Sequence, residues 1–168
     1  MESEFHEAML RALVKELETA RFNQWLGVFT LRSRPTGPVI GTATRLADRI
    51  WSERRYHSLP EAIDQAAQAM PGHRFGAWSE DLRGIAVVSP GPRWWTWHQI
   101  WQHHAVAAMH DSTQYRIGWR AEGPAPFSAI IAEPDTTPVW WPPGHRRATR
   151  TGAATARLLA AIASGGHR

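Results

Sequence analysis

The chain of 168 residues contains no cysteine. Without thiols it cannot form a disulfide framework, a thiolate zinc site or a cysteine nucleophile. Long apolar runs are also missing, because LLAAIA near the C-terminus is far too short to cross a bilayer and the first residues, MESEFHEAML, are acidic. We therefore expect a cytoplasmic protein without a membrane partner, whose chemistry depends on His, Asp, Glu, Ser, Thr or Arg side chains.

The sequence fingerprints of common enzyme classes are missing too. There is no phosphate-binding G-x-x-x-x-G-K-[ST] loop, no dinucleotide-binding G-x-G-x-x-G and no nucleophile elbow G-x-S-x-G. No pair of spaced carboxylates stands out for acid–base catalysis. Catalytic groups usually meet only in the fold, so these absences do not exclude an enzyme. The sequence predicts no cofactor and leaves open whether the protein catalyses a reaction.

Lysine is scarce, since Lys15 is the only lysine among 19 basic residues in a chain of net charge +4. A GC-rich coding bias explains the preference for arginine but not its distribution. Residues 1–20 hold five acids and two bases, a net charge of −3, whereas residues 136–168 hold five arginines and no acid, a net charge of +5. The acidic head and basic tail could pair within one chain, pair between neighbouring copies, or leave the tail free for a polyanion.

Apolar residues recur at three- and four-residue intervals in several segments, which is typical of amphipathic helices. Ser3 can cap the first helix, in which Glu7 is spaced to pair with Arg11. Ser58 and Glu61 form the S-x-x-E capping box of another. Residues 43–55 fit either a helix or a strand, and we favour the helix. The first helix is expected to run from Ser3 to about Ala20. Two other helices are expected, one over residues 94–110 and one over about 151–165.

Strands are expected mainly in hairpins. The strand in 114–121 should place Tyr115, Ile117 and Trp119 on one face and arginines toward solvent. The length favours one domain over 1–168 with a basic C-terminal segment at 142–168. Since hairpins outnumber βαβ units, the pattern favours an α+β fold: a mostly antiparallel sheet with about four to five helices packed on it. The other expected strands are 21–34 (covered on both sides), 39–44, 73–79, 83–89 and 127–132, with a proline-rich loop at 133–147.

The segment RWWTWHQIWQHHAVAAMH, residues 93–110, holds four of the ten tryptophans and four of the nine histidines. As a helix from about Trp94 to His110 it would place Trp94, Trp97 and Trp101 on one face. An aromatic stripe at helical spacing usually belongs to the core, so we expect this face to pack on the sheet.

The histidines of this segment lack the spacing of a helical metal site. The residues four positions after His98, His103 and His104 are not histidines, so no chelating pair at i, i+4 exists and no metal is expected. A small non-metal enzyme with a pocket lined by the 94–110 helix remains one hypothesis. Its candidate catalytic residues are His98, His104 and His110.

Arginine and tryptophan occur together twice, in RWW from Arg93 and in VWWPPGHRRATR from Val139. Bases stack on aromatic faces and guanidinium groups bind phosphate, but the same residues are enriched at protein interfaces, and a proline-stiffened loop can also fold onto its own domain. We expect a small basic binding module that contacts nucleic acid or acts inside a nucleoprotein assembly. The alternative is a protein-interaction or homo-oligomerising subunit that uses the acidic first helix and the basic tail. The candidate nucleic-acid-binding residues are Arg93, Trp95, Arg116, Arg120, Trp140, Trp141, Arg146, Arg147 and Arg150.

Overall fold

The computed structural model describes residues 2–19, 26–52, 58–70, 78–90, 102–110, 114–120, 130–131 and 147–165. Within these ranges the chain forms four helices and one sheet of six strands, which confirms the expected α+β fold. The helices are α1 (Glu2–Thr19), α2 (Thr44–Ser52), α3 (Leu59–Ala69) and α4 (Arg147–Gly165). The strands are β1 (Gly27–Arg34), β2 (Gly37–Thr42), β3 (Leu82–Pro90), β4 (Gln102–Met109), β5 (Gln114–Arg120) and β6 (Ile130–Ile131).

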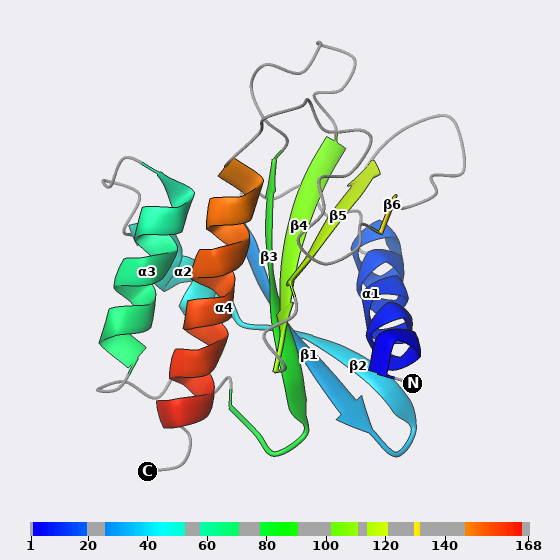
Figure 1. Ribbon diagram of the computed structural model, residues 1–168. Coiled ribbons are helices and arrows are strands. Elements are labelled where there is room, and N and C mark those ends of the chain that lie inside the picture. The colour runs from blue at the N-terminus through cyan, green and yellow to red at the C-terminus, as the bar shows by residue number, and fades with distance from the viewer. Residues whose placement is uncertain are drawn as a thin grey trace.

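The sheet is antiparallel throughout, in the order β2-β1-β3-β4-β5-β6. The expected hairpin of β1 and β2 is present, and Gly37 opens β2 at a φ of +118°, which favours glycine. Helices α2 and α3 connect β2 to β3, which lie on either side of β1. Three layers result, with α1 on one face of the sheet and α2, α3 and α4 on the other (Figure 1).

Each face of the sheet is covered by its own apolar core. On one face Met9, Leu13 and Leu17 of α1 are buried against the sheet, so the helical stripe expected there is confirmed. On the other face the buried side chains of α2, α3 and α4 pack together against β1 and β3. The first five residues of β1 are all buried, which confirms that this strand is covered on both sides.

Close approach between β3 and β4 requires glycine at position 84. A Cβ atom at Gly84 would lie 2.4 Å from the backbone oxygen of Ala108 and 2.8 Å from Sδ of Met109. Both distances are far inside van der Waals contact, so a larger residue would force the two central strands apart. The small side chains of Ala105, Ala107 and Ala108 are also fully buried in β4.

Local sequence signals fix several helix boundaries. The Ser58 side chain accepts a hydrogen bond from the Glu61 N–H and caps α3, as the S-x-x-E pattern predicts. Glu7 and Arg11 form the expected ion pair on α1, with an N–O distance of 2.5 Å. The segment that fitted a helix or a strand contains the helix α2. Helix α1 begins at Glu2, so Ser3 lies inside it rather than at its cap.

The hairpin expected between 73–79 and 83–89 is a wrong prediction. Both edges of β3 are taken, one by β1 and the other by β4, which leaves no edge for a third strand. Trp78 and Ser79 belong to no strand, and residues 71–77 lie outside the described residues. Glu80 and Asp81 form a turn before β3. Tryptophan and phenylalanine near a turn suit a strand by propensity, but pairing depends on long-range partners.

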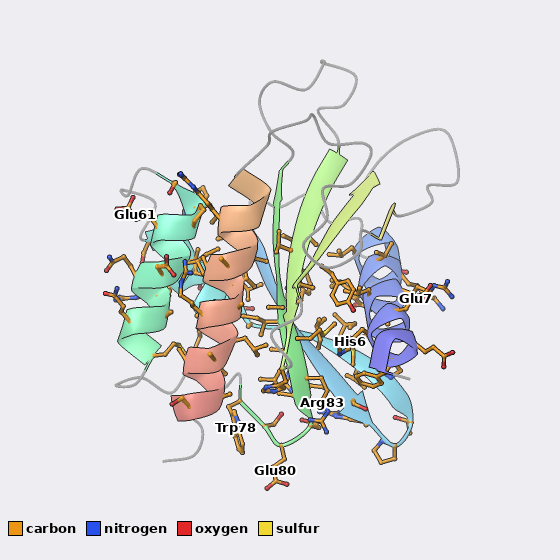
Figure 2. All side chains as sticks on the ribbon, in the orientation of Figure 1. His6, Glu7, Glu61, Trp78, Glu80 and Arg83 are labelled. Carbon is orange, nitrogen blue, oxygen red and sulfur yellow. The ribbon has the colours of Figure 1, made fainter. Side chains whose placement is uncertain are left out.

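His6 of α1, for which no role was predicted, is only 8% exposed and lies on the side of the helix that faces the sheet (Figure 2). Its Nδ1 atom lies 3.1 Å from the hydroxyl of Tyr115 on β5, and the two rings meet edge to face at 5.7 Å. A hydrogen bond satisfies these polar atoms in an otherwise apolar layer. The pair therefore ties α1 to β5, within the core that α1 covers.

A second polar cluster anchors the turn before β3 to the end of β1. The Asp81 carboxylate accepts hydrogen bonds from the Ser79 hydroxyl and from Nε of Arg34, the latter at 2.9 Å, and lies 3.5 Å from Nε of Arg32. The Ser33 N–H also donates to the Asp81 backbone oxygen at 2.9 Å. The cluster lies where the β1–β3 register shifts between Leu31 and Arg32, so side chains replace part of the regular ladder.

These contacts make stability depend on pH through Asp81. The hydrogen bond from Ser79, followed by that from Arg34, lowers the pKa of Asp81 below its ordinary value of 3.8. A group with a lowered folded-state pKa stabilises the fold above its unfolded pKa, and this contribution is lost as pH falls through the folded pKa.

We predict that Asp81→Asn lowers the urea midpoint at pH 7 and that its deficit relative to wild type shrinks below about pH 4. Glu80→Gln is the neighbouring control and should change little, whereas a deficit for Asp81→Asn that is independent of pH would contradict the assignment.

Candidate nucleic-acid interface

The basic C-terminal segment forms a longer helix than its sequence predicted. Helix α4 begins at Arg147, four residues before the expected start near Thr151. Arginine and alanine are strong helix formers, so the run from Arg147 to Arg150 joins the helix without needing Thr151 as a cap. Two of the candidate arginines, Arg147 and Arg150, therefore lie in the first turn of α4.

The first turn of α4 is positively charged. It contains no acidic residue, and the side chain of Arg150 is exposed. The N-terminus of a helix carries a partial positive charge, and proteins usually place acids there to offset it. Arginines at this position raise the local positive potential further. Together with the N–H groups of the first turn, which have no acceptor within the helix, they favour the binding of an anion such as phosphate.

Strand register places another candidate residue, Arg120, at the end of the sheet where β3 ends and β4 begins. Pro90, the last residue of β3, pairs with His103, and Gln102, the first residue of β4, pairs with Arg120, the last residue of β5. Helix α4 begins at this end of the sheet, at the top of Figure 1. We call this region, made up of Pro90, Gln102, Arg120 and the first turn of α4, the loop end of the sheet.

The other arginines and tryptophans of the candidate surface lie outside the described residues: Arg93, Trp95, Trp140, Trp141 and Arg146. In sequence, Arg93 follows Pro90 by three positions and Arg146 directly precedes Arg147. The described residues next to the two Arg/Trp segments, Pro90 and Arg147, both belong to the loop end.

Arg116 is the exception among the candidate residues. It pairs with Val106 in the middle of β5, four residues from Arg120, which corresponds to roughly 13 Å along a strand. Helix α4 packs against β4 and β5 on the sheet face opposite α1. The orientation of the Arg116 and Arg120 side chains is not described, so the expectation that they face solvent stays a prediction.

Part of the positive charge of the C-terminal segment is neutralised within the fold. Arg157 of α4 holds the Asp64 carboxylate of α3 through two hydrogen bonds, of 2.7 and 2.8 Å. The bond to Asp64 raises the pKa of Arg157. Such a partly exposed pair contributes little to stability, and α3 and α4 are held together mainly by their shared buried side chains. Arg150, by contrast, has an exposed side chain, so its charge is accessible at the loop end.

The expected helix at 94–110 is a wrong prediction over its second half, because Gln102–Met109 form the strand β4. Ala105, Ala107 and Met109 belong to the core under α1, while Ala108 belongs to the core under the other helices. A strand that is apolar on both faces shows no alternation, and its alanines imitate a helical pattern. Residues 91–101, which include Trp94, Trp97 and Trp101, lie outside the described residues.

The enzyme hypothesis loses its premise with that helix. His103 and His104 lie at the start of β4, where they pair with Trp119 and Gly118. His110 follows β4 in an exposed turn at the opposite end of the strand, with its N–H bound to the Arg83 oxygen at 2.9 Å. His98 lies outside the described residues. The strand therefore separates His104 from His110, and within the described ranges no three His, Asp or Glu side chains gather as metal ligands.

Comparison of the chain with protein-family models, with curated proteins and with solved structures gave no match. The described helices include none that is long and apolar enough to cross a membrane.

The positive charge at the start of α4 should lower the stability of the fold, because it lies at the positive end of the helix dipole. We predict that Arg150→Glu raises the free energy of unfolding by about 0.5–1 kcal/mol, because an acid interacts favourably with the helix N-terminus. Arg150→Gln should give a smaller gain, and high salt should reduce both. Urea denaturation at low and high ionic strength measures the effect. A loss of stability in Arg150→Glu would show that Arg150 does not act against the helix dipole.

Proposed function

We propose that the protein is a nucleic-acid-binding module whose contact surface is the loop end of the sheet. The observation that supports the proposal is that Pro90 and the N-terminal turn of α4, which are the described neighbours in sequence of the two Arg/Trp segments, lie at the same end of the sheet (Figure 1). In the described part of the chain no acidic residue lies in that turn, and Arg150 is exposed.

The residue types suit single-stranded RNA or DNA best. Guanidinium groups and helix N–H groups bind phosphates, and tryptophan rings give flat surfaces on which unpaired bases stack. Stacking on aromatic rings accepts any base, so such a surface predicts weak sequence preference. Affinity should then depend strongly on salt, because each neutralised phosphate releases a counterion.

The salt dependence gives a direct test. We predict that the triple variant Arg146→Ala, Arg147→Ala, Arg150→Ala binds a labelled single-stranded oligonucleotide more weakly than wild type. The slope of log affinity against log salt concentration should flatten by about 2, since each lost phosphate contact on a single strand removes about 0.7. Fluorescence anisotropy across a salt series measures both quantities.

A matched control removes the same charge elsewhere. The variant Arg11→Ala, Lys15→Ala, Arg83→Ala takes three exposed cations from α1 and β3. It should keep the wild-type slope. Equal slopes for wild type and the α4 variant, or no binding by wild type at low salt, would refute the proposal.

A second candidate function is self-association between the acidic and basic helices. Helices α1 and α4 lie on opposite faces of the sheet, so they cannot neutralise each other within one molecule (Figure 1). A contact between α1 of one copy and α4 of another would be heterologous and weakened by salt. Sedimentation at low salt tests it: salt-sensitive oligomers support this function, whereas a monomer at high protein concentration excludes it.

A further inference from the structure

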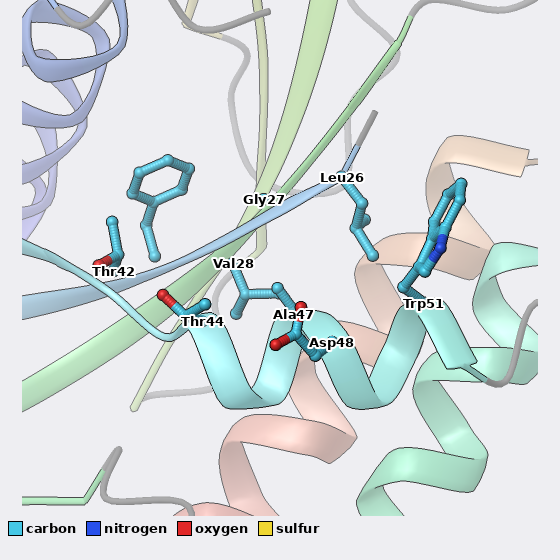
Figure 3. A pocket seen from close by; sticks show the side chains of 9 residues that line it. Leu26, Gly27, Val28, Thr42, Thr44, Ala47, Asp48 and Trp51 are labelled. Atoms are coloured by element: carbon cyan, nitrogen blue, oxygen red, sulfur yellow. The ribbon is translucent and has the colours of Figure 1, made fainter. Parts of the chain in front are cut away.

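A cavity of about 260 Å³ lies beside the first residues of β1, under helix α2. Leu26, Val28, Ala47 and Trp51 supply its apolar lining, and Thr44 and Asp48 supply polar groups. Figure 3 shows Leu26 and Trp51 at one end, Thr44 toward the other, and Asp48 between them. The cavity is therefore amphipathic along its length.

Strand lengths explain why this space exists. The pairing of β1 with β2 ends at Phe29 and Thr42, so Gly27 and Val28 extend beyond the end of β2. The chain then leaves the sheet at Ala43, whose N–H donates to the Val28 oxygen at 2.8 Å and whose own oxygen accepts from the Ala47 N–H at 2.9 Å. Helix α2 thus begins directly beside the part of β1 that has no partner on β2. The walls come from a strand and a helix fixed by backbone hydrogen bonds, so the cavity is built by regular structure.

Trp51 is the one large hydrophobic side chain classed as exposed in the described part of the chain, at 37%. It stands at the end of α2 with Leu26 beside it (Figure 3). An indole face at the rim of a cavity can stack on an apolar ring, and it attracts a cation through its quadrupole.

Asp48 gives the cavity its charge. Among the described residues it has no hydrogen-bond or ion-pair partner, whereas Asp64 and Asp81 are both held by arginines. Of the described residues that line the cavity, it is the only one with a charged side chain. Arg45 and Arg49 lie on the same helix but outside the lining. Solvent and salt therefore screen the charges of these two arginines from a bound ligand more strongly than they screen the charge of Asp48, which would contact the ligand.

We propose that this cavity binds a small organic cation, namely an ammonium group carried on an apolar body about the size of one aromatic ring. The apolar body would pack on Leu26, Val28 and Ala47, the ammonium group would bind the Asp48 carboxylate, and Thr44 offers a hydroxyl acceptor beside it. Trp51 would contribute through its ring face. An anion of the same shape would meet the Asp48 charge and be rejected.

The site is separate from the proposed nucleic-acid interface. Its residues belong to β1 and α2, whereas Arg147 and Arg150 belong to α4. The charge it selects is also opposite, because one surface binds anions and the other a cation. Failure of either proposal leaves the other unaffected.

Three probes of one shape test the proposal: phenethylammonium, the neutral 2-phenylethanol and the anionic phenylacetate. Each is titrated into ¹⁵N-labelled protein at pH 7 and followed by amide and indole NMR shifts. We predict that phenethylammonium binds most tightly and phenylacetate most weakly, with shifts centred on residues 26–28 and 44–51. The Trp51 indole signal, identified by its loss in Trp51→Leu, should move on binding.

Variants separate charge from shape. Asp48→Asn should weaken phenethylammonium about tenfold and leave 2-phenylethanol within about twofold. Trp51→Leu keeps an apolar wall and should weaken phenethylammonium about fivefold. Glu16→Gln removes an equal charge from the exposed face of α1 and should change neither. Equal binding of the three probes, shifts centred outside this cavity, or equal effects of Asp48→Asn and Glu16→Gln would each overturn the proposal.

Discussion

The central strands of the sheet are buried on both faces, and this double burial determines where small residues, polar groups and ligand sites can lie. Strands β1, β3 and β4 lie between α1 on one side and α2, α3 and α4 on the other, so apolar side chains line both faces. The strands tolerate this only with small residues at their closest approach, which is why Gly84 faces the backbone of Ala108. At about 25 cal/mol per Å² of apolar surface, these two layers supply most of the stabilisation. They also leave little space for polar chemistry in the middle of the sheet.

Polar and charged groups are consequently displaced to the places where regular pairing stops. The Asp81 cluster lies where the register between β1 and β3 shifts, and the cavity beside Asp48 lies where β1 extends beyond the end of β2. The loop end of the sheet carries the arginines at the start of α4. The rigid double-covered sheet acts as the scaffold, and ligand contacts are expected on the segments that it holds in place. Both proposed sites follow this division.

Much of the fold was predictable because several signals are local. The stripe of Met9, Leu13 and Leu17 and the capping box at Ser58 each indicate a helix within one or two turns, and the structure confirms both. Strand β4 was misread because burial on both faces removes the alternation that marks a strand. His6 carried a usable signal, since it is spaced four and seven residues before Leu10 and Leu13 on the buried stripe. The cavity had no such signal, because it depends on where the register of β1 and β2 ends.

Contact between nucleic acid and the loop end of the sheet can be mapped on the whole chain at once by hydrogen–deuterium exchange of the wild-type protein, with and without a single-stranded RNA oligonucleotide at low salt. We expect slower exchange confined to peptides covering residues 90–102, 118–121 and 144–151, with α1 and the β1–β2 hairpin unchanged. Protection centred on α1, or no protection anywhere with the oligonucleotide in excess, would refute the proposed contact surface.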